Sequence, residues 1–130
     1  MKLLNTIMCA FLLGGLIDLY AQTPVLNVEG GRIEGVVDEE GVTVYKGIPY
    51  AAPPVGELRW KHPQPVQPWQ GVRKCDRFGA ASLQSKATKG TFYWKEFYQN
   101  GSPEMSEDCL YLNVWTPAAG KKESKLPVMV

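Results

Sequence analysis

The stretch "SEDCLYLNVWTP", Ser106 to Pro117, decides the fold, because two carboxylates and a cysteine lead directly into an apolar strand pattern. Side chains alternate over residues 110–116: Leu, Leu and Val fall on one face, and Tyr, Asn and Trp on the other. A period of two is typical of a β-strand. Pro117 ends the pattern, since proline cannot donate a ladder hydrogen bond. The sequence therefore predicts a strand over 110–116, entered through a polar turn.

The adjacent carboxylates Glu107 and Asp108 suggest two roles. A general acid and base would have to face one reacting centre. Neighbouring residues of an extended chain point in opposite directions, so this pair does not meet that condition. A structural role at the entry to the strand is favoured.

A second, fully apolar strand is predicted over residues 126–130, "LPVMV", as in a sheet covered on both faces. An unfinished strand of this kind would leave an unpaired edge and exposed apolar side chains. We therefore expect this chain to be the front part of a longer protein.

Upstream, residues 32–37 and 42–48 are rich in β-branched side chains and predict a β-hairpin, with a glycine in the connection 38–41. Prolines then interrupt regular structure, and Trp60 and Trp69 are expected to anchor extended loops to the surface.

Aromatic residues at 93 and 97, and again at 94 and 98, have helical spacing. Their rings either line a ligand pocket or carbohydrate platform, or pack as core beneath a loop. Packing is the favoured interpretation, because aromatic pairs at this spacing more often pack than recognise a ligand.

Residues 1–21 are interpreted as a signal peptide, since Lys2 precedes an apolar run and Ala21 offers a small cleavage residue. A membrane-spanning helix is disfavoured because Gly14, Gly15 and Asp18 interrupt the run. The mature chain, residues 22–130, is expected to be secreted or periplasmic, with no membrane span after cleavage.

The net charge of +1 gives no basic footprint for nucleic acid and no cationic face for anionic lipid. No metal or other cofactor is expected, because His62 is the single histidine and no CxxC motif occurs. Cys75 and Cys109 remain after cleavage and can in principle pair in an oxidising compartment.

Three ordered blocks resemble the type B carboxylesterase family, which includes carboxylesterases, cholinesterases and bile-salt lipases. They are "SEDCLYLNVWTP", "VYKGIPYAAPPVGELRW" and "PWQGVRKCDRFG", and the resemblance runs from about Val25 to Val130. It implies an α/β-hydrolase fold with only its N-terminal β-rich part present: a small antiparallel sheet plus the first strands of the main sheet.

The resemblance also implies a serine hydrolase that acts on small-molecule carboxylic esters through an acyl-serine intermediate. Its oxyanion glycines, its Gly-x-Ser-x-Gly elbow and its later acid and histidine have no counterpart in these 130 residues. No catalytic residue is therefore assigned in this chain, which is expected to be inactive by itself.

The same resemblance suggests structural roles for a signature set. Glu107 is expected to pair with Arg59, and Asp108 to cap nearby backbone N–H groups. Cys109 aligns with a family cysteine whose usual partner position is Ser82 here, so a free thiol is expected, with a Cys75–Cys109 disulfide left open. The signature set comprises Arg59, Glu107, Asp108, Cys109, Leu110, Tyr111, Leu112 and Asn113.

Gln99 stands where the cholinesterases carry a choline-binding tryptophan, so a general ester hydrolase is favoured over a choline-specific one. Two alternatives remain open. One is a catalytically silent adhesion or binding member of the same fold. The other is a small secreted β module that binds carbohydrate through Trp60, Trp69 and Trp94.

Overall fold

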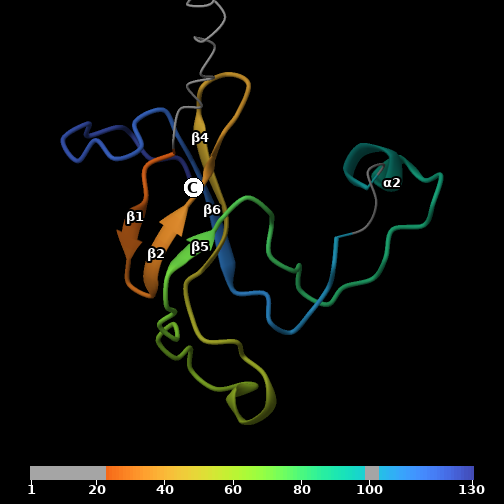
Figure 1. Ribbon diagram of the computed structural model, residues 1–130. Helices are drawn as coiled ribbons and strands as arrows, with labels where there is room; N and C mark the ends of the chain where they lie inside the picture. Colours follow the sequence, from red (N-terminus) through yellow and green to blue (C-terminus); the bar gives the residue numbers. More distant parts are fainter. Residues whose placement is uncertain (1–22, 99–102) are drawn as a thin grey trace, which may run out of the picture.

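The structure, a computed structural model, describes residues 23–98 and 103–130. Two three-stranded sheets lie side by side, and a short helix stands apart from them (Figure 1). The predicted signal peptide and Gln99 lie outside the described residues.

The first sheet has the order β1-β2-β5. Strand β1 (Leu26–Val28) pairs antiparallel with β2 (Gly31–Glu34). Strand β5 (Val72–Lys74) then pairs parallel with β2, in the register Ile33 to Arg73. A segment nearly forty residues further along the chain thus returns to the N-terminal hairpin.

The second sheet has the order β3-β4-β6 and is antiparallel throughout. Strand β4 (Thr43–Pro49) lies between β3 (Val36–Val37) and β6 (Tyr111–Thr116). Most of β4 is buried, which fits its run of apolar and β-branched residues. The strand predicted at 110–116 is therefore present as β6.

Cys75, directly after β5, links the two sheets. Its N–H donates to the Glu34 carbonyl of β2 in the first sheet over 2.7 Å, and its carbonyl accepts from the Lys46 N–H of β4 in the second sheet over 2.8 Å. A small core lies beside this junction. Its buried members are Ile33, Tyr45, Ile48 and Cys75, with Leu26, Val28, Trp69 and Ala119 packed against them.

The hairpin predicted from 32–37 and 42–48 is only partly present. Gly35 divides the first run at a point where the backbone passes so close to β4 that a Cβ would lie 2.3 Å from the Val44 carbonyl oxygen. Residues before Gly35 join the first sheet as β2, and only β3 pairs with β4. The connection is held by Asp38, whose carboxylate accepts from the N–H groups of Glu40 and Val42.

The two tryptophans of the proline-rich loops differ. Trp69 packs against Gly30 and Gly31, and its indole N–H donates to the Arg32 carbonyl over 2.9 Å, so it is an anchor as predicted. Trp60, which follows the short 3₁₀ helix η1 (Gly56–Leu58), is 96% exposed. The prediction that Trp60 anchors the loop is wrong in the described chain.

The helix α2 (Phe92–Phe97) forms where helical spacing predicted it, but its rings do not pack as core. Phe92, Tyr93 and Phe97 are exposed, and α2 contacts no strand of residues 23–98 and 103–130. The favoured packing interpretation is therefore wrong: the aromatic rings contact one another instead.

The strand predicted over 126–130 is not formed. Leu126, Val128, Met129 and Val130 are exposed, and no described strand runs beside them to share backbone hydrogen bonds. An apolar run thus forms no strand where it has no neighbour. Within the part of the chain that the structure describes, no helix is long and apolar enough to cross a membrane.

Candidate functional site

The sequence signature meets around the entry to β6. Arg59 lies directly after η1, Glu107 to Leu110 form the approach, and Tyr111, Leu112 and Asn113 open the strand. The signature residues come from two segments almost fifty residues apart, so the role of each depends on contacts between these segments.

The structure brings Arg59 and Glu107 together. The Arg59 Nη2 donates to the Glu107 Oε2 over 2.5 Å. The two side chains are 52% and 37% exposed, so water screens the pair. This ion pair ties the proline-rich loop to the approach of β6, at a modest gain in stability.

Asp108 does not cap a described backbone N–H. Its own N–H donates to the Ser106 Oγ over 3.1 Å, and its carboxylate lies near the Tyr111 hydroxyl. Burial, followed by the hydrogen bond and negative charge of Asp108, raises the pKa of Tyr111. The carboxylate therefore faces a side chain rather than the backbone.

Asn113 has a contact that the sequence did not reveal. The Gly47 N–H donates to the Asn113 Oδ1 over 2.9 Å. The pairing of β4 with β6 shifts register between Tyr45 and Ile48, and the amide side chain satisfies a backbone group at this irregularity. A glycine inside a run of β-branched residues was the available signal.

Cys75 and Cys109, the two cysteines among the described residues, are free thiols. Cys75 is fully buried, whereas Cys109 is half-buried and lines a hollow of about 370 Å³ that Ser82 also lines. The Cys75–Cys109 disulfide that the sequence left open is not formed here. Burial raises the pKa of the Cys75 thiol, which disfavours its reactive thiolate.

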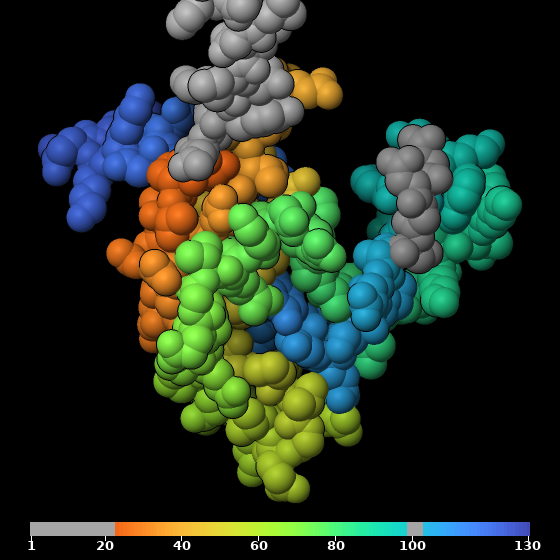
Figure 2. Space-filling view, viewed as in Figure 1, coloured from red at the N-terminus to blue at the C-terminus, as the bar shows by residue number. Residues whose placement is uncertain are grey.

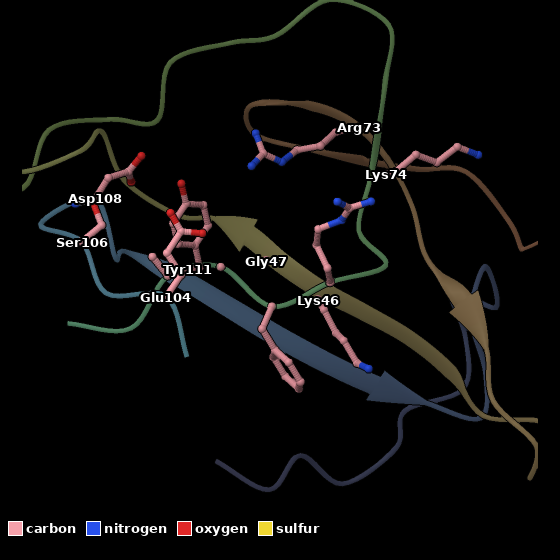
Figure 3. A pocket seen from close by; sticks show the side chains of 12 residues that line it. Lys46, Gly47, Arg73, Lys74, Glu104, Ser106, Asp108 and Tyr111 are labelled. Carbon is pink, nitrogen blue, oxygen red and sulfur yellow. Dashed lines mark hydrogen bonds between the residues drawn. The ribbon is translucent and has the colours of Figure 1, made fainter. Parts of the chain in front are cut away.

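A larger hollow of about 400 Å³ lies between the approach to β6 and strands β4 and β5 (Figure 3). Figure 3 shows Asp108, Tyr111 and Glu104 on one side and Arg73 and Lys74 on the other. It is lined by Lys46, Gly47, Arg73, Lys74, Arg77, Phe78, Gly79, Ala80, Glu104, Ser106, Asp108 and Tyr111.

This hollow has charge of both signs but no nucleophile beside a base. Ser106 accepts from the Asp108 N–H, and His62 lines neither hollow. No group of metal-binding side chains occurs in the described residues. The geometry thus supports a structural role: the Arg59–Glu107 ion pair and the Gly47–Asn113 hydrogen bond form what we call the joint around β6.

The carbohydrate-platform alternative needs Trp60, Trp69 and Trp94 to share a face. Trp69 is packed against Gly30 and Gly31, while Trp60 lines the smaller hollow and Trp94 lies on α2. The three rings lie on separate segments, and neither hollow holds more than one of them. This arrangement does not form a platform.

A sequence model described as "Carboxylesterase family" matches residues 22–130. Similar curated proteins include a pyrethroid hydrolase of Rattus norvegicus, 39% identical over 89% of this chain, and the liver carboxylesterase of Sus scrofa, 39% identical over 85%. The match covers 23% and 21% of these two relatives. The chain thus spans about a fifth of their length.

A solved structure of PNB esterase superposes with a TM-score of 0.62 at 35% identity, over 72% of this chain and 18% of that one. The fold class predicted from the sequence, the N-terminal β-rich part of an α/β-hydrolase, is confirmed by this likeness.

Proposed function

The chain belongs to the carboxylesterase family, and from this premise we propose that it is the N-terminal part of an exported carboxylic-ester hydrolase. The observation that carries the proposal is the family match over residues 22–130. It is supported by relatives that are named as a pyrethroid hydrolase and a liver carboxylesterase and are about five times longer.

In the full-length parent, small-molecule carboxylic esters would be cleaved through an acyl-serine intermediate. The 130 residues contain no Gly-x-Ser-x-Gly elbow, so the triad belongs to sequence beyond them. This chain contributes architecture: Arg59 and Glu107 join the proline-rich loop to β6, and Asn113 holds β4. No cofactor is involved in this chemistry.

Residues 1–21 act as the signal peptide in this proposal, and residues 22–130 form the truncated N-terminal part of the hydrolase domain. The parent is then secreted or periplasmic. Sequencing the N-terminus of the exported protein tests this: we expect it to begin near Gln22. A product that retains Met1 at its N-terminus would contradict export by cleavage.

Esterase activity of the chain itself is expected to be absent, since it has no elbow and no oxyanion glycines. The measurement is hydrolysis of nitrophenyl acetate by the full 130-residue chain. A His62→Ala variant with acetylated lysines supplies the control for non-specific acyl transfer. A rate clearly above that control would place a working nucleophile inside these residues.

A silent binding member of the same fold is the second candidate, because the joint around β6 serves architecture with or without catalysis. Labelling of the full-length parent by a fluorophosphonate separates the two. A single labelled serine in a Gly-x-Ser-x-Gly elbow supports the hydrolase, and no labelling supports the binder.

A further inference from the structure

Residues 83–98, which we call the aromatic lobe, expose apolar rings and lysines together. Phe92 is 76% exposed and Phe97 67%, with Leu83 and Tyr93 also exposed. The lobe stands away from the sheets, at the side of the molecule, in Figures 1 and 2. Exposed apolar side chains gathered on one short segment indicate an interaction surface.

Local contacts hold the lobe in shape. The Thr91 hydroxyl accepts from the Trp94 N–H over 3.2 Å and donates to the Thr88 carbonyl over 2.7 Å, so Thr91 caps α2. The Tyr93 ring lies 4.9 Å from that of Phe97 and 5.7 Å from that of Tyr98. The rings of Tyr93, Phe97 and Tyr98 therefore form one cluster, and Phe92 is exposed on the same short helix.

The charge of the lobe differs from that of the whole chain. Lys86, Lys89 and Lys95 are exposed and Glu96 is the one acid in the segment, so three positive charges minus one give +2. The chain carries +1 in total, which leaves −1 for all other residues. The near-neutral average thus conceals a local cationic surface.

The combination of rings and lysines selects the kind of partner. The cores of protein interfaces are depleted in lysine, so a protein partner would have to bury unfavourable charges. At a membrane surface, aromatic rings sit at headgroup level while lysines extend to anionic headgroups. We propose that the aromatic lobe docks peripherally on an anionic phospholipid surface.

The test uses the full chain and vesicles of phosphatidylcholine and phosphatidylserine with brominated acyl chains, which quench nearby tryptophan emission. Subtracting the emission of a Trp94→Phe variant isolates the signal of the lobe, so binding through another part of the chain does not contribute. We expect the Trp94 emission to fall about twofold, and to recover in high salt.

Two variants check the cause, each measured as the same Trp94 difference. Phe92→Ser with Phe97→Ser removes the apolar contact, and Lys86→Gln, Lys89→Gln and Lys95→Gln together remove the charge. Each set should lower the apparent affinity about tenfold or more. Val128→Ser with Met129→Ser, which changes exposed apolar residues elsewhere, should leave it unchanged.

Several outcomes would overturn the proposal: vesicles that do not quench Trp94 emission, equal quenching by pure phosphatidylcholine, or quenching that survives loss of the lysines.

Discussion

Gly47 is the residue on which the junction of β4 with its surroundings depends. Its φ of +68° lies in the left-handed region, and a Cβ there would come within 2.7 Å of the Arg77 carbonyl oxygen and 3.2 Å of the Gly79 nitrogen. Both contacts are with backbone, which cannot rotate away. A side chain at this position therefore meets conformational strain and a steric clash together.

Gly47→Ala is expected to lower the free energy of unfolding by about 3 kcal/mol, from strain and overpacking combined. Gly41→Ala is the matched control, since Gly41 has a φ of +80° but open space around it. It should cost only about 1 kcal/mol. Urea unfolding of both variants checks this, and equal losses would contradict the clash.

Cys75 and Tyr45 are expected to make the free energy of unfolding fall as the pH becomes alkaline. Burial raises the pKa of both groups; the negative charge of the Cys75 thiolate adds to the rise at Tyr45, whereas the positive charge of Arg73 opposes it at Cys75. A raised folded-state pKa gives stability that is full below the unfolded-state value and lost as pH rises toward the folded value. The unfolded thiol ionises at about 8.5, so the loss begins there.

We therefore expect the free energy of unfolding to fall as pH rises above about 8.5, and Cys75→Ala to flatten the first part of that fall. Ile33→Val, a second core truncation, controls for the cavity: it lowers stability at all pH values without changing the slope. Urea titrations at several pH values measure this. If Cys75→Ala left the slope of stability against pH unchanged, the Cys75 thiol would not be the source of the pH dependence.

At the scale of elements, the Arg59–Glu107 ion pair couples the proline-rich loop to β6. Its partial exposure limits the coupling energy to about 0.5 to 1 kcal/mol, reduced by salt. A double-mutant cycle with Arg59→Met and Glu107→Gln measures this coupling. The pair of Arg77 and Asp76, which are adjacent in sequence and have an 86% exposed arginine side chain, should give a smaller coupling energy. Equal coupling energies would show that the Arg59–Glu107 pair stabilises the fold no more than an exposed surface pair does.

Some elements could be predicted because local pattern and final environment agree. The alternation over 110–116 gave β6 within one residue, since β4 lies beside it. The run 126–130 has as strong an apolar pattern but no described neighbour, so it forms no strand. A strand needs a partner for its backbone groups, and the pattern of one segment does not reveal the partner.

In the candidate site, too, some contacts could be predicted from the sequence and others depend on tertiary packing. The family resemblance implies the pairing of Arg59 with Glu107, whereas neither the resemblance nor the residue pattern predicts the Gly47 to Asn113 hydrogen bond. That bond depends on a register shift, which arises from the packing of two strands. The division of the hairpin at Gly35 likewise follows from close approach to Val44, a tertiary contact.

The whole molecule combines a small core with large open surfaces. Strand β6 lies at the edge of its sheet, and its residues Leu112, Val114 and Trp115 are exposed. No charged residue occurs from 110 to 120. Natural edge strands are usually protected by charge, proline or a covering element, and this one has no such protection within its own length.

We therefore expect the chain to self-associate as its concentration rises, through the edge of β6. Val114→Lys places a charge on that edge and should shift the distribution in sedimentation velocity towards monomer. Val25→Lys is the control, because Val25 is as exposed but lies outside every strand. A wild-type chain that stays monomeric and melts cooperatively at all concentrations would instead support a self-sufficient β module.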